Sequence, residues 1–384
     1  MALPVSILSI GSLSPLGHSP EKVWQNYLSD RHFITSHKIG RDYVPVSALS
    51  ADEAEIINSI RASDSRYKNL DASVLYAIAA SRSAVKLAGW APGDTFGVNI
   101  GSSRGATQLF ENHYDDFSKL GKVSPQASPA TTLGNISSWV AADLATAGPE
   151  ISHSITCSTA LHAVLNAVAW LGSGMADKFL AGGSEAPLTP FTIAQMKAMK
   201  IYSQSAEEYP CRALDMAKKE NTMILGEGAA VVCLEAGKKR NALAFIEGVG
   251  YATEVLTHGA SITPEGDSLK RAMLMALKNT DVGEVDAIVM HAPGTVKGDL
   301  SEYKAIQSVF GDHMPLLTGN KWKIGHTFGT SGLLSLEMAV MMLQNNKFIP
   351  VPYLETPAKH KSLRKILVNA VGFGGNAVSI LVSR

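Results

Sequence analysis

The sequence predicts an α/β protein whose sheets are covered by helices on both faces. Short apolar runs of strand length alternate with longer segments in which apolar residues recur at helical spacing, and glycine-rich turns separate many of them. Hydrophobic residues make up 46% of the 384 residues and charged residues 18%. This balance supplies a large apolar core and is untypical of disordered chains.

The first half of the chain repeats a pattern of strand, turn and helix. Leu75, Ile78 and Val85 lie at helical spacing and Gly89 follows as a stop signal, so a helix is expected over residues 71–87. Residues 30–65 are polar and irregular, which indicates a surface excursion. A second helix is expected over 158–171, and strands at 5–10, 96–100, 151–156, 179–181 and 229–234.

The second half of the chain echoes this pattern. It contains an apolar strand at 287–290, an apolar helix at 333–343 and a closing strand at 378–382. A chain of this length is expected to form two domains, or one large domain with an internal duplication. The boundary is placed near residue 245, which gives the halves 1–245 and 246–384.

Charge and composition exclude several classes of function. The 34 Lys and Arg residues balance the 34 Asp and Glu residues, so no concentrated positive charge is available for a nucleic acid. Three cysteines without a CxxC pair fit a reducing cytosol better than a disulfide framework. No apolar run reaches the ~18 residues of a membrane span, and the N-terminus lacks the pattern of a secretory signal. A cytoplasmic protein without membrane segments is therefore expected.

Cys157 lies where a predicted strand ends and a predicted helix begins. A thiol there faces the positive end of the helix dipole and the free N–H groups of the first turn, and both favour the reactive thiolate. A free cysteine is also often a small buried hydrophobic residue. Position alone leaves these two interpretations equally open. Cys211, in a polar loop without a nearby base, and Cys233, within an apolar strand, are assigned to structural roles.

His291 and His326 both lie at strand ends or in glycine-rich turns, where α/β proteins place working groups. Neither has a second ligand at a usual metal spacing such as HExxH, so no metal ion is expected. One cysteine and two histidines suit a different chemistry. Decarboxylation of a malonyl thioester creates an enolate, whose oxygen two imidazoles can stabilise in a cavity that excludes water.

These segments resemble the β-ketoacyl synthases of the elongating Cys–His–His type, within the thiolase-like superfamily. The resemblance spans nearly the whole chain and rests on seven motifs in the family's order and spacing. They are residues 11–17 (GSLSPLG), 156–158 (TCS), 181–185 (AGGSE), 226–229 (GEGA), 291–302 (pattern HGTxTxxxDxxE), 321–326 (KxxxGH) and 372–376 (GFGGN). Each glycine motif is weak alone, but seven in order are very specific.

The resemblance implies the five-layered αβαβα fold of the thiolase-like superfamily, built from two similar halves. It also implies an acyltransferase, a β-ketoacyl-acyl-carrier-protein synthase, that needs no cofactor. Cys157 would receive an acyl group from a carrier-bound thioester. His291 and His326 would activate the malonyl unit for decarboxylation and hold the enolate oxygen. Lys321 would orient and polarise the site around His326.

Further roles come with the same resemblance. The backbone N–H groups of Cys157 and Phe373 would form the oxyanion hole, and the Phe373 side chain would gate the acyl channel. Thr295 would hydrogen-bond the pantetheine arm. Trp139 and Leu133 lie where the family builds its dimer contact and the far end of the acyl pocket, so they are expected to influence chain length. The implied partners are an acyl carrier protein and a second subunit, either a copy of this chain or a chain-length factor.

The sequence departs from the family pattern at three places. Ala292-Pro293 replaces Gly-Thr, which removes one of two pantetheine-binding threonines. The closing motif lacks a Thr between Gly375 and Asn376, and Ser335 replaces the Glu expected nine residues after the second histidine. These changes spare the Cys–His–His set. They indicate a branch away from housekeeping fatty-acid synthesis, in polyene or polyketide biosynthesis.

The main alternative from another class is a non-catalytic or weakly catalytic chain-length-factor-like partner of another ketosynthase. Such subunits share the fold but lack the nucleophile, whereas this chain has Cys157 and both histidines. A degradative thiolase would need a second, C-terminal cysteine, and none follows Cys233. An initiating synthase of the Cys–His–Asn type would have Asn in place of His326. The condensing subunit is therefore favoured.

Overall fold

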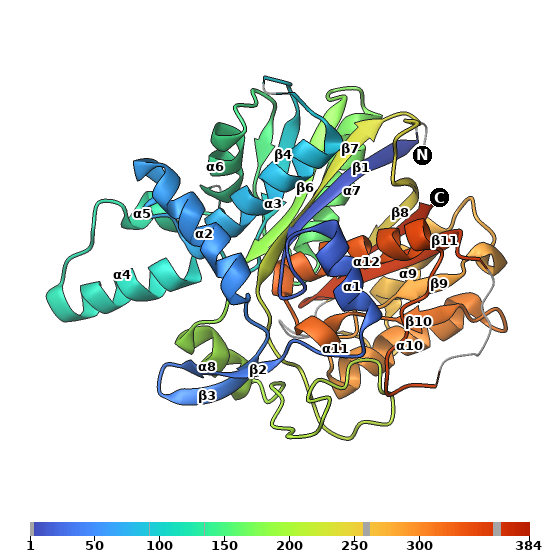
Figure 1. The fold of residues 1–384 in the computed structure, drawn as a ribbon. Helices are drawn as coiled ribbons and strands as arrows, with labels where there is room; N and C mark the ends of the chain where they lie inside the picture. Colours follow the sequence, from blue (N-terminus) through green and yellow to red (C-terminus); the bar gives the residue numbers. More distant parts are fainter. Residues whose placement is uncertain (1–3, 92, 134, 256–261, 356–361) are drawn as a thin grey trace.

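The computed structural model describes residues 4–91, 93–133, 135–255, 262–355 and 362–384. Within these residues ten strands form one sheet, in the order β10-β9-β11-β12-β8-β1-β7-β6-β4-β5 (Figure 1). From the centre outward, each half of the sheet has two antiparallel pairings followed by two parallel ones. The two halves therefore share one topology, as the prediction of two similar halves requires.

Each half of the sheet comes from one half of the chain. The N-terminal half contains β1 (Val5–Leu13), β4 (Gly97–Gly101), β5 (Glu150–Ile151), β6 (Lys178–Glu185) and β7 (Gly228–Ala236). The C-terminal half contains β8 (Ala244–Ala252), β9 (Ala287–Val289), β10 (Leu316–Thr318), β11 (Lys365–Gly372) and β12 (Asn376–Ser383). They meet where β1 pairs with β8 at three positions only, Val5–Ile246, Ser6–Phe245 and Ile7–Ala244. Beyond these pairs the halves separate and enclose helices between them.

Three apolar clusters define five layers. In the middle layer α7 (Thr159–Gly172) and α12 (Ser331–Asn345) pack together with residues from both half-sheets. On one outside face α3 (Ala72–Ala88) covers the N-terminal half-sheet. On the other, α9 (Asp267–Ala276) and α10 (Val296–Phe310) cover the C-terminal half-sheet. This order of layers is the predicted αβαβα arrangement.

Glycines on the two central strands let the outer helices approach closely. A Cβ added at Gly11 of β1 would come within 2.3 Å of the Ala80 carbonyl oxygen of α3. In the other half, a Cβ at Gly250 of β8 would come within 1.9 Å of the Ala272 carbonyl oxygen of α9. A side chain at either position would push helix and strand apart. In both halves, therefore, a glycine on a central strand lets the outer helix pack closely on the sheet.

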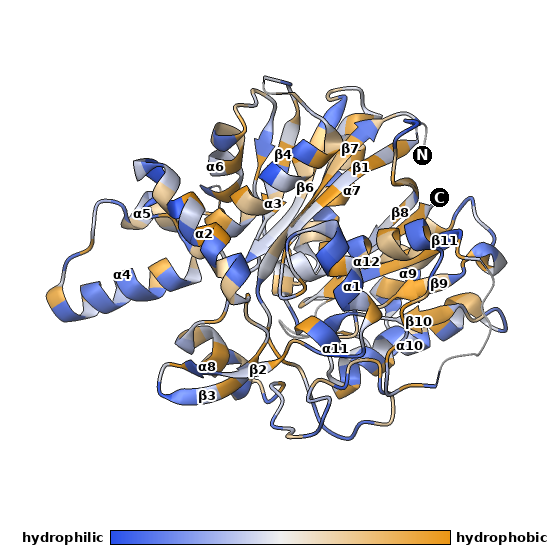
Figure 2. Ribbon diagram, in the orientation of Figure 1, coloured by the Kyte–Doolittle hydropathy of each residue, from blue (hydrophilic) through white to orange (hydrophobic). Residues whose placement is uncertain are grey.

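The remaining elements decorate these layers. Among the described residues no helix combines the length and the apolar character needed to cross a bilayer. Figure 2 shows that exposed segments such as α4 carry mixed polar and apolar residues. The elements are α1 (Pro20–Leu28), β2 (Thr35–Ile39), β3 (Asp42–Val46), α2 (Ala51–Ser63), α4 (Thr107–Leu120), α5 (Ala127–Thr131), α6 (Asn135–Asp143), α8 (Pro190–Ala198), α11 (Lys321–Ile324) and short 3-10 turns at Ser65–Tyr67, Val282–Glu284 and Phe328–Thr330.

Two expectations about local structure were wrong. Residues 30–65 are not irregular, because they contain the β2–β3 hairpin and helix α2, which buries Ile57 and Ile60 against α3. The strand expected over 151–156 is limited to β5, at Glu150–Ile151. The following residues instead form a tight turn, since Thr156 takes a left-handed backbone with φ of 45°. Hydropathy alone does not detect either feature.

Helix α12 of the middle layer contains a buried carboxyl side chain, Glu337, among its apolar residues. Every residue of α12 from Ser331 to Leu343 is buried, and Glu337 is among them. Burial raises the pKa of Glu337 to about 7, and a hydrogen bond from Ser12 only partly opposes this. One carboxyl oxygen has no hydrogen-bond partner among the described residues. A neutral, protonated Glu337 is therefore the form that the folded protein favours below pH 7.

The stability of the fold should depend on the charge of Glu337. The folded protein keeps this proton up to about pH 7, whereas the unfolded chain releases it near pH 4.5, the ordinary pKa. Protonated Glu337 therefore contributes its full stabilisation of the folded state below about pH 4.5. This contribution is lost as the pH rises through about 7, the pKa in the folded protein. Relative to Glu337→Gln, the wild type should lose up to about 3 kcal/mol of unfolding free energy from pH 4.5 to 8. Urea denaturation at both pH values measures this, and a constant difference would contradict it.

Candidate active site

One cavity of about 650 Å³ brings together residues from both halves of the chain. Its lining is largely apolar and includes five residues that the sequence singled out: Cys157, Thr295, His291, His326 and Phe373. They come from four separate segments of the sequence, around residues 157, 291–295, 326 and 373, which the fold brings together.

The Cys157 turn is held by the first residue of the helix that follows it. The Thr159 hydroxyl donates to the Thr156 carbonyl at 2.6 Å and accepts the Ile155 N–H at 2.9 Å. This pair of bonds closes the turn and stabilises the left-handed backbone of Thr156. Cys157 is thereby held, buried, two residues before the N-terminus of α7.

The closing glycine motif packs directly on this turn. A Cβ added at Gly372 would lie 1.8 Å from the Thr156 hydroxyl and 3.1 Å from the Cys157 backbone nitrogen. Only glycine allows this approach. Phe373, the next residue, lines the cavity and is about one-third exposed, at 37%. The backbone of the 372–373 segment therefore lies beside the Cys157 N–H.

Two carboxylates of α10 hold the turn that carries His291. Glu302 accepts the N–H of His291 at 2.9 Å and of Ala292 at 2.8 Å. Asp299 accepts the N–H of Gly294 at 3.0 Å. The residue between them, Pro293, has no N–H to satisfy. The backbone N–H groups of His291, Ala292 and Gly294 therefore all donate to acidic side chains of α10.

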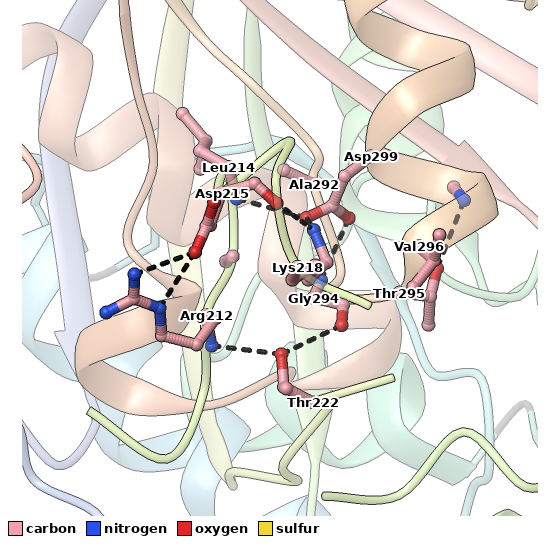
Figure 3. A network of polar contacts seen from close by, with 12 residues as sticks. Arg212, Leu214, Asp215, Lys218, Thr222, Ala292, Gly294, Thr295, Val296 and Asp299 are labelled. Carbon is pink, nitrogen blue, oxygen red and sulfur yellow. Dashed lines mark hydrogen bonds and ion pairs between the residues drawn. The ribbon is translucent and has the colours of Figure 1, made fainter. Parts of the chain in front are cut away.

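Asp299 is also part of the polar network drawn in Figure 3. Its other carboxyl oxygen accepts from the Lys218 ammonium at 2.6 Å and from the Leu214 N–H at 3.0 Å, with both charged side chains buried. Thr222 joins the same network by donating its hydroxyl to the Gly294 carbonyl at 3.0 Å. The His291 turn is thus tied to the loop before β7 as well as to α10.

His326 is held through its backbone. Its N–H donates to the Ile224 carbonyl at 2.6 Å, and its own carbonyl accepts the Gly226 N–H at 3.1 Å. Its ring lies 5.2 Å from the ring of His291, at 79° between the planes. The Nδ1 atom of each ring has no hydrogen-bond partner among the described residues. The two imidazoles therefore face each other edge to face at the base of the cavity.

The two imidazoles are neutral in the resting protein. Burial holds the pKa of His291 well below its ordinary value, with further lowering by the charges of Lys321 and His326. Burial and Lys321 do the same to the pKa of His326. A neutral imidazole can both donate and accept a hydrogen bond. The cavity therefore holds two uncharged groups that can exchange protons with a ligand.

Burial and nearby charges act in opposite directions on the pKa of Lys321. Lys321 begins α11 and is buried, and burial lowers its pKa to about 8, although the charge of Glu302 opposes this. It lies behind the imidazoles and does not line the cavity. Its electrostatic partners include Cys157, so a negative sulfur would stabilise the ammonium form.

The expected thiolate is not the resting form of Cys157. Burial raises the pKa of its thiol to about 12, and the charge of Glu185 raises it further, against the opposing charges of Lys321 and Arg104. Desolvation thus outweighs the helix terminus that favoured thiolate in the sequence. Burial also raises the pKa of Glu185 to about 7, so this neighbour is itself partly neutral near that pH. The nucleophilic form must be created by proton transfer.

Three of the seven non-glycine residues with positive φ in the described part of the chain lie next to the reactive groups of the cavity. Thr156, Ala292 and Phe328 all have positive φ, at 45°, 24° and 42°. Each lies within two residues of Cys157, His291 or His326. Such conformations cost free energy and persist where the surrounding structure enforces them, most often at functional sites. This supports the assignment of the cavity as a site of chemistry.

Two of the predicted residues lie elsewhere. Trp139 packs edge to face on Tyr67, with ring centroids 6.0 Å apart, and Leu133 is 40% exposed beside Gly105. Neither lines the cavity that contains Cys157. Their expected influence on chain length stays a prediction.

Sequence reasoning missed two residues that border the site. Phe328 lines the cavity and lies 5.6 Å, ring to ring, from His326. The Arg104 guanidinium lies 5.4 Å from the Phe328 ring and hydrogen-bonds Gln195 of α8. The glycine-rich turn after β4 was visible in the sequence, but nothing local shows that its arginine reaches Cys157.

The described residues around this site show no arrangement that would hold a metal ion. Among the residues that the structure describes, no group of three or more His, Cys, Asp or Glu side chains converges in the required way. The three cysteines are buried free thiols.

Replacing Glu302 by Gln should destabilise the His291 turn. The amide places a donor where the carboxylate accepted a backbone N–H, so one buried donor loses its partner. The unfolding free energy should fall by about 2 kcal/mol, measured by urea denaturation. Glu265→Gln is a matched control, since that exposed side chain only pairs with Lys304 at 2.7 Å. Equal effects of the two substitutions would contradict the role of Glu302.

Comparison with known proteins agrees with this geometry. Family models match residues 2–240 as the β-ketoacyl synthase N-terminal domain and residues 243–355 as the C-terminal domain. The 3-oxoacyl-[acyl-carrier-protein] synthase 2 of Staphylococcus aureus (strain COL) is 30% identical over 98% of this chain and 97% of its own. That of Coxiella burnetii is 28% identical over 99% and 98%.

Solved structures show the same fold. The ishigamide ketosynthase/chain length factor superposes with a TM-score of 0.88 at 20% identity, covering 100% of this chain and 99% of the other. A β-ketoacyl synthase from Burkholderia phymatum STM815 gives 0.84 at 22% identity, over 100% and 99%. The chain therefore belongs to the β-ketoacyl synthase family of the thiolase-like superfamily, and it is an acyltransferase-class condensing enzyme.

Proposed function

We propose that this chain is a β-ketoacyl-acyl-carrier-protein synthase that condenses an acyl thioester with malonyl-carrier protein through an acyl-Cys157 intermediate. The observation that carries the proposal is one cavity lined by one thiol and two neutral imidazoles. The N-terminal half, residues 1–245, supplies the thiol, and the C-terminal half, residues 246–384, supplies both imidazoles.

In the first step the Cys157 thiol gives its proton to the neutral imidazole of His291, and the sulfur attacks the carbonyl of the acyl thioester. The oxyanion is stabilised by the N–H groups of Cys157 and Phe373. The close approach of Gly372 to the Cys157 nitrogen supports this pairing. The carrier thiol leaves with a proton, and the acyl group stays on sulfur.

In the second step a malonyl thioester enters the same cavity. Loss of CO₂ leaves the bonding electrons on the thioester as an enolate, whose oxygen accepts hydrogen bonds from His291 and His326. The enolate carbon then attacks the acyl-Cys157 carbonyl, forms the new carbon–carbon bond and releases the sulfur. Lys321 stabilises the negative charge from behind. The apolar lining excludes water from the acyl intermediate.

The pantetheine arm of the carrier is assigned to the outer part of the cavity. Thr295 caps α10 by accepting the Gly298 N–H at 3.2 Å, which leaves its hydroxyl hydrogen for a ligand. Phe373 gates the acyl channel from the opposite wall. Lys219 and Lys297 also line the cavity and provide positive charge for an anionic carrier.

We propose a polyene or polyketide pathway rather than housekeeping fatty-acid synthesis. The replacement of Gly-Thr by Ala292-Pro293 and of the expected Glu by Ser335 supports this, as does the shortened closing motif. A cytoplasmic location is proposed with it. The alternative, a chain-length-factor-like subunit, predicts a wild-type protein that never acylates.

Cys157→Ala should abolish the acyl-enzyme and condensation. His326→Ala should lower malonyl decarboxylation by about 100-fold, because a transition-state donor is lost, while Cys157 acylation stays largely intact. Intact-mass spectrometry with a labelled acyl-carrier thioester measures acylation, and release of labelled CO₂ measures decarboxylation. Failure of the wild type to acylate, alone or with a co-purified partner, would overturn the proposal.

A second subunit is proposed to cover the exposed stripe of α4. Phe110, Tyr114, Phe117 and Leu120 recur at helical spacing and are 53–71% exposed on a helix that projects from the body (Figure 1). Unpartnered apolar stripes of this kind mark interaction surfaces. The proposed occupant is either a second copy of this chain or a chain-length factor.

Phe117→Asp should shift the purified protein from dimer to monomer in light scattering after size exclusion. A charge in the middle of the stripe makes its burial unfavourable. Leu274→Asp is the matched control, since Leu274 is 50% exposed on α9, and it should leave the mass unchanged. A wild type that is monomeric at micromolar concentration would exclude the homodimer and leave the heterodimer to be tested by co-expression.

A further inference from the structure

Helix α11 is too short to hold its own position. It has four residues, Lys321–Ile324, and an isolated helix of this length is not stable in water. Yet it carries Lys321 and leads through Gly325 into His326, which lines the cavity. Tertiary contacts must therefore place it.

The strongest of these contacts comes from Lys323. Its ammonium donates to three backbone carbonyls at the end of α1: Asn26 at 2.9 Å, Arg31 at 2.7 Å, and Ser29. The same nitrogen lies 4.6 Å from the centroid of the Trp322 ring. An ammonium has three donors, and all three are used. Lys323 is as completely buried as the leucines and isoleucines of the core, at 1% exposure.

This arrangement is costly and specific. Burial lowers the pKa of Lys323 to about 8, and the charge of Asp30 opposes this only partly. The ammonium donates to carbonyl dipoles instead of to a carboxylate, at the helix end where unsatisfied carbonyls gather. A buried charge that apolar packing could replace indicates a positional requirement.

Two further bonds complete the attachment. The Phe33 N–H donates to the Lys323 carbonyl at 2.7 Å, so the lysine both gives and receives hydrogen bonds with this segment. At the other end of α11, the Asn320 amide donates to the Tyr27 hydroxyl of α1 at 3.3 Å. Residues 26–33 therefore hold α11 at both ends.

The two lysines of α11 lie on opposite sides of the helix. They are two positions apart, which on an α-helix separates them by about 200°. Lys321 acts electrostatically on Cys157, His291 and His326, while Lys323 faces the end of α1. A shift of the Lys323 attachment would therefore move Lys321, whereas His326 keeps its own backbone bonds to Ile224 and Gly226.

We infer that Lys323 is a positioning residue, which anchors α11 to the carbonyls at the end of α1 and thereby sets the placement of Lys321 beside the two imidazoles. The inference rests on the proposed condensing function and assigns a residue beyond it. It concerns chiefly the decarboxylation step, in which Lys321 stabilises the negative charge of the enolate, because the Cys157 turn and the His291 turn used in acylation are held by other residues.

Lys323→Met tests this, because methionine keeps most of the side-chain volume and cannot donate to the carbonyls. Decarboxylation of malonyl-carrier protein should lose about 10- to 100-fold in kcat with KM changed less than threefold, because the reacting groups are misplaced while the substrate site remains. Acylation of Cys157 by butyryl-carrier protein should stay within about twofold of wild type. Lys365→Met, which removes ion pairs to Glu284 and Glu247 on the far strand β11, should leave both rates unchanged.

The outcomes separate the two proposals. A Lys323→Met protein that decarboxylates at the wild-type rate, or that loses acylation and decarboxylation equally, overturns the positioning role. A wild type that neither acylates nor decarboxylates overturns the proposed function instead. Should Lys323→Met fail to fold, Tyr27→Phe tests the same attachment by removing its bond to Asn320. It should lower decarboxylation severalfold and spare acylation, and an unchanged rate would overturn the inference.

Discussion

The enclosure of α7 and α12 between two half-sheets is the constraint on which the site depends. Most of their side chains pack on apolar residues of the half-sheets, with exceptions such as Asn166 of α7, which hydrogen-bonds Asn99, and the buried Glu337 of α12. The segments at their N-terminal ends meet: a Cβ on Gly329 would lie 3.1 Å from the Thr159 Cβ. Cys157 and His326 emerge just before these ends. The fold thus gathers the reactive groups next to the N-terminal ends of its two middle-layer helices.

Much of this arrangement could be predicted from the sequence, and the limits have physical reasons. Alternating apolar segments predicted an α/β protein with sheets covered on both faces, because strands buried on two faces are apolar along their whole length, and the resemblance to the family implied the order of the five layers. The groups around the cavity were found because glycine-rich turns and the family motifs surround Cys157, His291 and His326. Arg104 and Phe328 were missed, since their approach to the cysteine depends on long-range packing. The charge state of Cys157 was misjudged for the same reason: desolvation is a property of the folded surroundings, whereas a helix terminus is visible locally.

The structure also shows how a buried turn can be held without free polar groups. Glu302 and Asp299 take the donors of the His291 turn, and Thr159 closes the Cys157 turn. The strained backbones at Thr156 and Ala292 persist because these bonds leave no alternative conformation of equal energy. The rigidity of the site is therefore built into backbone hydrogen bonds, and the reacting side chains are left free to bind substrate.

The burial of Cys157 has a consequence for the life of the protein in the cell. Peroxides and electrophiles attack thiolates far faster than thiols. Because burial raises the pKa of the Cys157 thiol to about 12, the resting sulfur is mostly a thiol and is expected to react slowly with such agents, and the other two cysteines are buried as well. The desolvation that makes the resting nucleophile less reactive therefore also slows its oxidation, in a cavity that still admits the substrate.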